Sequence, residues 1–216
     1  MLLPLEDIYF IRALARTHNL RGFSVTIPHK TAVIPYLDEL DEEAVAIGAV
    51  NTVKVEHRQD KIYMKGYNTD APAFIETLKP LLRPDLNKAL VLGSGGASRA
   101  VCHALIQLGI AYQIVSRTPA KLGHIAYASV TNEMMESYLL IINTTPLGMY
   151  PDITSMPSIP YEGISGRHLV YDLVYNPAET ALIQKARQHG AATKNGLEML
   201  GLQAQLAWAI WADNDK

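Results

Sequence analysis

The sequence predicts an α/β protein with two domains, and three observations lead to that prediction. The chain has 216 residues, 49% of them hydrophobic, which is enough for one large domain or two small ones. Its second half alternates apolar, strand-like runs with helical or loop segments, as βαβ units with a parallel sheet do. Its first half instead holds two alternating strands around a polar turn, which predicts a separate α+β module with a hairpin.

The elements of the first half follow from the spacing of its apolar residues. Residues 4–17 carry them at helical intervals behind a proline, so a helix is expected there. Residues 23–27 alternate as a strand, which must end near Pro28 because proline cannot donate to a ladder. The remaining expected elements are two short helical pieces ending at Gly48, strands at 49–56 and 62–68, and a helix at 71–82.

The second half contains four apolar runs of the length and composition of buried strands. They cover residues 89–93, 112–116, 139–145 and 169–175. The carboxyl-terminal part is predicted to form two helices, near 178–189 and from about 197 to 212.

Composition excludes several classes of partner. The formal net charge is -2 and no run of Lys or Arg exceeds two residues, so a basic face for nucleic acid is not expected. No apolar run approaches the roughly 20 residues of a membrane span, and the amino terminus lacks the pattern of a signal peptide. We expect a cytoplasmic protein with a small-molecule partner and no membrane contact; the sequence leaves the oligomeric state open.

The cysteine and the histidines do not indicate a metal or a nucleophile. Cys102 is the only cysteine and lies among apolar residues, so it is expected to be a small buried hydrophobic residue. The seven histidines are scattered, without a pair at helical spacing beside an acidic ligand, and no metal is predicted. A G-x-S-x-G elbow for a hydrolase is also missing.

A glycine-rich loop, GSGGASRA, follows the apolar run at 89–93 and precedes a helical segment. Gly93 permits a tight turn, Gly95 lets the backbone approach a pyrophosphate, and the helix beginning near Ala97 presents unpaired N–H groups to that anion. Ser98 occupies the place of the third glycine of the usual motif. A purely structural turn is the alternative, but strand, loop and helix together predict a dinucleotide site in a Rossmann-like domain.

The end of the next strand indicates which dinucleotide. NAD-specific sites usually place Asp or Glu there, whereas this chain has Arg117 between two hydroxyl residues, Ser116 and Thr118, with Lys121 four residues further on. A guanidinium suits a 2′-phosphate, so NADP is favoured over NAD. The alternative is that Arg117 only opens a solvated loop.

Lys30 lies two residues behind the proline that ends the first strand. The carboxyl ends of strands in open α/β sheets are where ligands bind, so Lys30 is a candidate catalytic group. Spacing alone favours the alternative, a solvated lysine that starts the next helix.

Eight motifs, in order along nearly the whole chain, resemble the shikimate dehydrogenase family of NADP-dependent enzymes. They are GFSVTIPHK, AIGAVNTV, GYNTDA, LGSGGASRA, SRT, NTTPLGM, DLVYNP and NGLEMLGLQA. Each is weak alone, and together they are specific.

The resemblance implies a role for individual positions. Lys30 matches the family's catalytic lysine, and Asp70 matches the carboxylate paired with it. The implied substrate-binding residues are Thr26, Asn51 and Gln203, which hold the hydroxyls and carbonyl of the substrate, and Tyr175, which lies near its carboxylate. The implied cofactor residues are Gly93, Ser94, Gly95, Gly96 and Ala97 at the pyrophosphate, Ser116, Arg117, Thr118 and Lys121 at the adenosine phosphate, and Gly196 and Met199 beside the nicotinamide.

The residues themselves leave other readings open. Asn51 and Asp70 could be turn formers, Tyr175 a core aromatic and Gln203 an exposed helix residue.

The chemistry of the reaction agrees with the role that the resemblance implies for Lys30. Hydride delivery to a ketone leaves charge on oxygen, which an ammonium such as that of Lys30 can stabilise and protonate.

The sequence departs from the family in three places. Ser116 stands where the family usually has Asn, and the helix expected after Arg117 is reduced to PAKLG. The family's opening strand, helix and strand, with two serines for the substrate carboxylate, have no counterpart in this sequence. We therefore expect the chain as written to turn over poorly unless a longer amino terminus or a partner supplies them.

The resemblance implies an α/β fold of two domains, an α/β substrate domain of residues 1–69 plus 196–216 and a Rossmann-like NADP-binding domain of residues 70–195. The expected function is reversible NADPH-dependent reduction of 3-dehydroshikimate to shikimate, in aromatic amino-acid biosynthesis. Two alternatives remain, a quinate/shikimate dehydrogenase of broader specificity and a catalytically impaired NADP-binding remnant.

Overall fold

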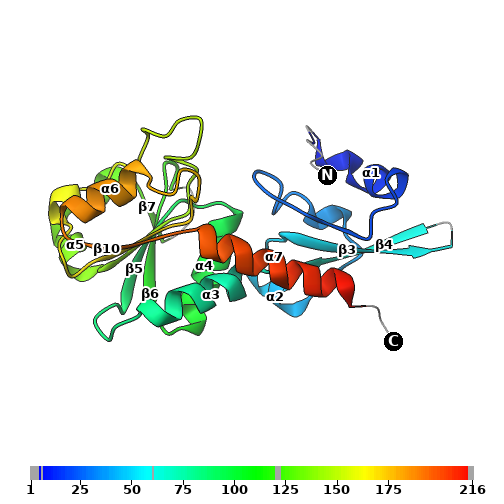
Figure 1. Ribbon diagram of the computed structural model, residues 1–216, viewed down its shortest axis with the longest axis horizontal. Helices are drawn as coiled ribbons and strands as arrows, with labels where there is room; N and C mark the ends of the chain where they lie inside the picture. Colours follow the sequence, from blue (N-terminus) through cyan, green and yellow to red (C-terminus); the bar gives the residue numbers. More distant parts are fainter. Residues whose placement is uncertain (1–4, 6, 60, 120–122, 214–216) are drawn as a thin grey trace.

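The computed structural model describes residues 5, 7–59, 61–119 and 123–213, and within them it forms two β-sheets. One sheet has four strands in the order β1-β3-β4-β2, and the other has six in the order β10-β9-β8-β5-β6-β7. Figure 1 shows the sheets in two lobes, with the last helix, α7, running across both. We call these the four-stranded lobe and the six-stranded lobe.

The four-stranded lobe is built from the described residues between 7 and 67. Its strands are mostly antiparallel, β1 with β3 and β3 with β4, while β2 runs parallel to β4. Helix α1 and loop residues cover the sheet around buried valines and Met64. Its elements are η1 (Ile8–Phe10), α1 (Ile11–Thr17), β1 (Gly22–Ser24), η2 (Ile34–Tyr36), β2 (Glu39–Leu40), α2 (Glu42–Ile47), β3 (Thr52–Arg58) and β4 (Lys61–Tyr67).

The six-stranded lobe has a sheet in which every pairing is parallel. Its elements are α3 (Asp70–Leu78), η3 (Lys79–Leu81), β5 (Lys88–Leu92), α4 (Gly96–Gln107), β6 (Ala111–Val115), β7 (His124–Ile125), η4 (Tyr127–Ser129), α5 (Asn132–Ser137), β8 (Leu140–Asn143), η5 (Tyr161–Gly163), β9 (Leu169–Asp172), α6 (Ala181–Gln188) and β10 (Ala192–Asn195), followed by α7 (Leu197–Ala212).

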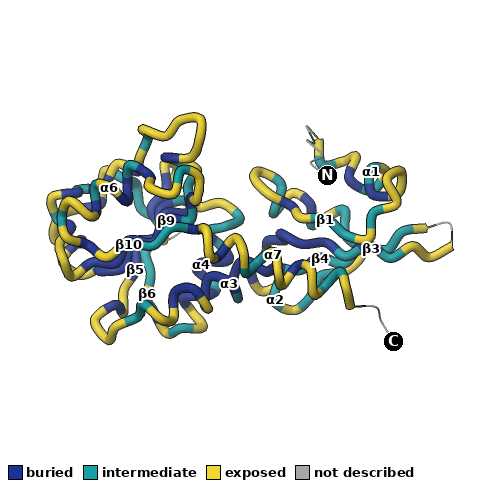
Figure 2. The backbone as a smooth tube through the Cα atoms, viewed as in Figure 1, coloured by how far each residue is buried: buried dark blue, intermediate teal, exposed yellow. Residues whose placement is uncertain are grey.

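Helices cover both faces of the parallel sheet. On one face α3, α4 and the start of α7 bury a core that includes Phe74 and Leu105, and on the other α5 and α6 bury Met135 and Leu182. The central strands β5, β8 and β9 are buried almost throughout, as their dark colour in Figure 2 shows. This is the doubly covered arrangement that parallel strands require.

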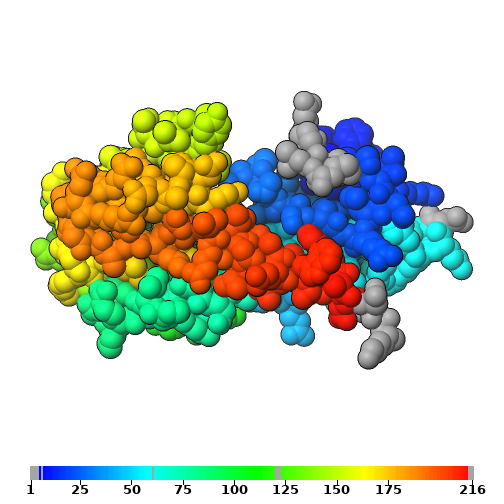
Figure 3. Space-filling model, viewed as in Figure 1, coloured from blue at the N-terminus to red at the C-terminus, as the bar shows by residue number. Residues whose placement is uncertain are grey.

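Helix α7 connects the two lobes. It packs against α3 in the six-stranded lobe and against β3 in the four-stranded lobe, where Trp211 Nε1 donates to the Val53 carbonyl at 3.0 Å. Figure 3 shows it, in orange-red, lying along one face of both lobes. The helix therefore contacts both lobes.

The α/β class and its parallel sheet are confirmed, and the second carboxyl-terminal helix runs over the predicted residues. The strand expected at 23–27 ends at Ser24, because the chain then turns and the His29 amide donates to the Thr26 carbonyl. Strands β2, β7 and β10 were not predicted. The first two have two residues each, and β10 is a polar edge strand, Ala-Thr-Lys-Asn, without an apolar pattern.

Cys102 is buried as predicted. Burial raises the pKa of its thiol to about 11, so the sulfur remains protonated at neutral pH. Among the described residues no group of three metal-ligating side chains lies together, and no helix there has the length and apolar character to cross a bilayer.

Candidate functional site

A mostly buried ion pair lies between the two sheets. Lys30, in the turn after β1, places its Nζ 2.6 Å from Oδ2 of Asp70, the first residue of α3. The two side chains are only 15% and 7% exposed. Two opposite charges held this close, with little water around them, form a group that can bind and protonate an oxygen of a ligand.

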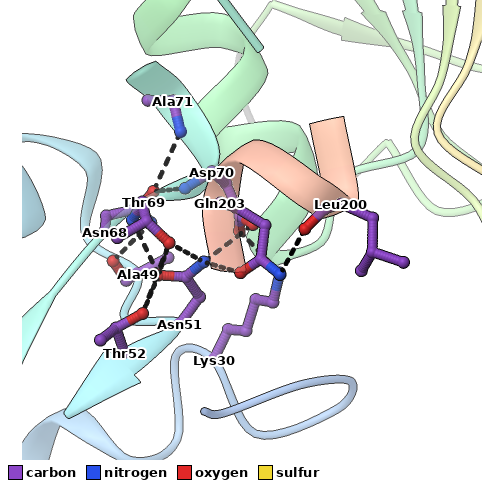
Figure 4. Close-up of polar contacts among 10 residues, drawn as sticks. All are labelled: Lys30, Ala49, Asn51, Thr52, Asn68, Thr69, Asp70, Ala71, Leu200 and Gln203. Carbon is purple, nitrogen blue, oxygen red and sulfur yellow. Dashed lines mark hydrogen bonds and ion pairs between the residues drawn. The ribbon is translucent and has the colours of Figure 1, made fainter. Parts of the chain in front are cut away.

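Asparagine side chains orient the carboxylate of Asp70. Asn51 Nδ2 donates to Asp70 Oδ1 and to Thr69 Oγ1, both at 2.9 Å, and Asn51 Oδ1 accepts from the Thr69 amide at 2.8 Å. Asn68 Oδ1 accepts from the backbone amides of Asp70 and Ala71 and so caps the start of α3. The Asp70 side chain is thereby left to face Lys30 (Figure 4).

Helix α7 brings Gln203 to the same cluster. Its Oε1 lies 3.4 Å from Asn51 Nδ2, while its Nε2 donates to the Leu200 carbonyl (Figure 4). Thr26 and Tyr175 are exposed, and no hydrogen bond within the described part of the chain joins either of them to the ion pair. The structure thus brings Asn51 and Gln203 beside Lys30 and Asp70, and leaves Thr26 and Tyr175 at the surface.

The glycine loop after β5 has the local geometry that phosphate binding requires. Gly93 has φ +109°, and a Cβ on it would lie 2.7 Å from Thr144 Oγ1, so only glycine fits. A Cβ on Gly95 would meet nothing within 4 Å. No side chain caps α4, whose first turn follows directly. Its free N–H groups are therefore available to an anion.

A cavity of about 490 Å³ lies between this loop and the turn after β1. That volume is within the usual range for small-molecule and cofactor sites. Cationic and hydroxyl side chains, free amides and a few apolar residues surround it, which suits an anionic dinucleotide. The lining residues are Ile27, Pro28, Lys30, Thr31, Gly93, Ser94, Gly95, Gly96, Ala97, Arg99, Ser116, Arg117, Thr118, Tyr127, Thr144, Thr145, Pro146 and Leu147.

The end of β6 supplies the polar edge of this cavity. Ser116 Oγ lies 3.1 Å from Ser94 Oγ and accepts from the Thr118 amide at 3.3 Å, so the two loops are tied together. Arg117 is exposed, and its guanidinium has no salt bridge to any residue that the structure describes. The cation is free to meet a ligand. Lys121 lies outside the described residues.

Gly196 and Met199 lie at the start of α7. A Cβ on Gly196 would overlap the Leu173 carbonyl oxygen at 2.0 Å, so the close approach of the chain to β9 requires glycine there. Met199 is 7% exposed and packs in the core beneath the sheet. Neither residue lines the cavity.

Several cavity residues were not identified from the sequence. The motif NTTPLGM contributed to the resemblance without individual roles, yet residues 144–147 form one wall of the cavity. Arg99, in the first turn of α4, could have been found by placing it one helical turn after Gly95. Tyr127 carries no such signal. Burial raises the pKa of its phenol, while the nearby positive charge of Arg117 acts in the opposite direction.

A buried carboxylate braces the wall at residues 144–147. Asp172 accepts from Asn143 Nδ2 at 2.9 Å and from Thr180 Oγ1 at 2.5 Å, and Asn143 Oδ1 in turn accepts from Thr145 Oγ1 at 2.6 Å. Burial raises the pKa of Asp172, although these hydrogen bonds oppose the shift. The network fixes the loop after β8 to the end of β9 and the start of α6.

The chain is similar in sequence and in fold to shikimate dehydrogenases. Residues 4–53 match the family of the shikimate dehydrogenase substrate binding domain. Shikimate dehydrogenase (NADP(+)) of Carboxydothermus hydrogenoformans is 40% identical over 220 residues, which are 95% of this chain and 76% of that protein. That of Caldanaerobacter subterraneus is 41% identical over 209 residues, covering 89% and 72%. The chain thus spans about three quarters of the length of these relatives.

Solved structures agree with the sequence matches. The complex of Thermus thermophilus shikimate 5-dehydrogenase with NADP(H) and shikimate superposes with a TM-score of 0.80 at 35% identity, covering 98% of this chain and 80% of that one. Quinate dehydrogenase from Corynebacterium glutamicum in complex with NAD is less similar in sequence, with 26% identity, a TM-score of 0.81 and coverage of 97% and 78%. The chain therefore belongs to the shikimate dehydrogenase family of NADP-dependent oxidoreductases and has the α/β fold of that family.

Proposed function

We propose that this protein is a shikimate dehydrogenase that reversibly reduces 3-dehydroshikimate to shikimate with NADPH. The observation that carries the proposal is the position of Lys30, whose side chain lines the cofactor cavity and contacts the buried Asp70. A catalytic ammonium is thus next to the place where a dinucleotide fits.

The chain's own residues supply the proton chemistry. NADPH, when bound, provides the hydride for the ketone carbon. The Lys30 ammonium would donate a hydrogen bond to the ketone oxygen, stabilise the charge that develops on it, and deliver the proton that completes the hydroxyl. Asp70, held by Asn51 and by its place at the start of α3, orients Lys30 for that transfer.

We assign the substrate to the space around the ion pair. Asn51 and Gln203, which lie beside Asp70, are proposed to hold substrate hydroxyls, with Thr26 as a further hydroxyl partner. Tyr175, 43% exposed, is proposed to approach the substrate carboxylate.

The cofactor is assigned to the cavity of about 490 Å³. Residues 93–97 would surround the pyrophosphate, and Ser116, Arg117 and Thr118, with Lys121, would hold the adenosine phosphate. Gly196 and Met199, which lie outside this cavity at the start of α7, are proposed to border the nicotinamide. These assignments make NADP the preferred cofactor, because Arg117 offers a cation at the position where NAD-specific sites carry a carboxylate.

We propose that residues 1–69 with 196–216 form the substrate domain and residues 70–195 the cofactor domain. Separate apolar clusters in the two lobes support a boundary near Asp70. The start of α7 packs in the core of the six-stranded lobe, so the assignment of 196–216 to the substrate domain rests on its later part, where Trp211 bonds to Val53 of β3.

The test is the rate of NADP reduction by the purified chain with shikimate, compared with quinate and with NAD in place of NADP. Turnover that is fastest with shikimate and NADP is the expected result, at a low rate for the chain as written. Faster turnover with quinate and NAD would favour the alternative, a quinate/shikimate dehydrogenase of broader specificity. The structural similarity to quinate dehydrogenase supports that alternative. NADPH binding without any turnover would contradict the proposal.

A further inference from the structure

The first turn of α4 contacts the four-stranded lobe as well as the cofactor cavity. Gly96, which lines that cavity, lies against the stem of Lys30, and a Cβ on Gly96 would be only 2.8 Å from Lys30 Cβ. The start of the helix therefore touches the proposed catalytic lysine directly.

One turn further on, Arg99 reaches across to α2. Its Nη1 donates to the Gly48 carbonyl at 3.1 Å. Gly48 ends α2 in the left-handed conformation, with φ +66°, and a Cβ there would lie 2.8 Å from Arg99 Nη1. The glycine therefore gives the guanidinium room to reach the carbonyl, and the half-buried Arg99 satisfies a helix-end oxygen in the other lobe.

Gly48 opens a short segment, residues 48–51, that leads to the ion pair. The Ala49 carbonyl accepts from Asn68 Nδ2 at 2.9 Å, and the Val50 amide donates to the Lys30 carbonyl at 2.8 Å. Asn51 then holds the Asp70 carboxylate. The backbone of this segment thus connects the hydrogen bond from Arg99 to the hydrogen bonds with Lys30 and Asp70.

The other polar link at this interface is weaker. His103 of α4 lies 3.9 Å from Glu43 of α2, too far for a strong hydrogen bond, and both side chains are partly exposed. Arg99 also lines the cofactor cavity, so the same side chain borders the phosphate loop and the segment 48–51.

We propose that Arg99 is a positioning residue for the reaction, which fixes the segment 48–51 against the phosphate-binding turn of α4 and so keeps Lys30, Asp70 and Asn51 aligned with the cofactor. The proposal rests on the proposed function for its kinetic consequences. Its structural consequence, an ordered segment 48–51, is independent of the identity of the substrate.

The kinetic test compares wild type, Arg99→Ala and Arg99→Lys in shikimate oxidation, with shikimate varied at saturating NADP and NADP varied at saturating shikimate. Arg83→Ala is a matched control, because Arg83 Nη2 also donates to a backbone carbonyl, that of Arg167 at 2.6 Å, away from the cavity. We expect Arg99→Ala to lower kcat and to raise the KM for shikimate, each by about tenfold or more. A change of that size corresponds to the free energy of one hydrogen bond to a charged group. Arg99→Lys should recover part of the loss, and Arg83→Ala should match wild type.

Gly48→Ala tests the hydrogen bond between Arg99 and Gly48 from the other side, without substituting a residue that lines the cavity. Its Cβ would displace the guanidinium, so kcat and the KM for shikimate should change as in Arg99→Ala while the KM for NADP stays within about twofold. If Arg99→Ala raises only the KM for NADP, Arg99 is a phosphate ligand and the positioning role is refuted. Unchanged kinetics in both variants would refute it as well.

A readout without substrate separates this inference from the proposed function. Amide hydrogen exchange of the peptide containing residues 48–51 should accelerate in Arg99→Ala and Gly48→Ala but not in Arg83→Ala. Accelerated exchange in a protein whose wild type does not oxidise shikimate would support the inference and contradict the proposed function. Equal exchange in all variants would overturn the inference whatever the activity.

Discussion

Lys30 Nζ and Asp70 Oδ2 are 2.6 Å apart although 40 positions separate the two residues in the chain. The contact needs three independent elements: the turn that follows β1, the asparagine-capped start of α3, and the segment 48–51 that carries Asn51. The cavity proposed for the cofactor opens beside Lys30, so the pair lies where the proposed substrate and cofactor sites meet.

Lys30→Ala should lower kcat for shikimate oxidation by about 100-fold or more, the usual contribution of a positioned general acid or base. NADPH affinity should change much less, because Lys30 forms only one part of the cavity wall. Steady-state kinetics and fluorescence titration with NADPH measure the two quantities. Asp70→Asn should show a related loss of kcat, since the amide cannot hold the ammonium by charge.

Lys79→Ala is the control for the loss of a lysine, because Lys79 forms an exposed ion pair with Glu76 on the surface. It should behave as wild type. Near-normal turnover in Lys30→Ala would remove the catalytic assignment and leave Lys30 as a residue that only packs against Gly96.

Arg117→Ala should weaken NADPH binding far more than NADH binding. A hydrogen bond to a charged group contributes about 1.5–3 kcal/mol, which corresponds to roughly 10- to 150-fold in the dissociation constant. NADH lacks the 2′-phosphate and should lose little. Titration of both cofactors against wild type and variant gives the comparison, and equal losses for the two would show that Arg117 does not contact that phosphate.

The sequence predicted best what local spacing encodes. Helix α7 and the central strands β5, β8 and β9 have long apolar patterns, and the structure has them close to the predicted places. Strand β10 could not be predicted in this way, because it is a polar edge strand whose position depends on pairing with β9.

The site residues also divide into those with a local sequence signal and those whose place depends on tertiary packing. The glycine loop and Arg117 carry local signals, and both line the cavity. The contact of Lys30 with Asp70 depends on tertiary structure, and only the family resemblance implied it. Tyr127 was missed because its position beside the cavity arises from the packing of η4 against other elements. Arg99 was also missed, although the helical turn after Gly95 could have indicated it.

His168→Gln should change how stability depends on pH. His168 is 1% exposed. Its Nδ1 accepts from the Ser165 amide at 3.0 Å and its Nε2 donates to the Met135 carbonyl at 2.9 Å. Because one ring nitrogen accepts and the other donates, the folded state favours the neutral imidazole. Burial lowers the pKa of His168 below its usual 6.5. The wild type should therefore lose stability as pH falls from about 7 through 6.5 toward the lowered pKa, because the unfolded chain binds the proton first. Urea denaturation at pH 5–7.5 should show a flatter profile in the variant, with His18→Gln, at an exposed position, as control. Identical slopes in wild type and His168→Gln would contradict this assignment.

Gly95→Ala should separate the stability of the glycine loop from its ability to bind a cofactor. Gly95 has extended backbone angles, φ -85° and ψ -168°, which alanine adopts readily, and its Cβ would contact no protein atom within 4 Å. The melting temperature should therefore stay within about 2 °C of wild type, as expected for a substitution that costs under about 0.5 kcal/mol. NADPH affinity should nevertheless fall by about tenfold or more, because the new methyl group would hold the pyrophosphate away from the loop amides.

Two further glycine variants provide the comparison for Gly95→Ala. Gly201→Ala, at an exposed position within α7 where a Cβ also meets nothing, should stabilise the helix by about 0.5–1 kcal/mol and leave NADPH binding unchanged. Gly93→Ala should lower both the melting temperature and NADPH affinity, because φ is +109° and the Cβ would lie 2.7 Å from Thr144 Oγ1. Thermal denaturation and NADPH titration of the three variants check these outcomes. If Gly95→Ala binds NADPH as tightly as wild type does, the pyrophosphate does not approach the backbone at Gly95.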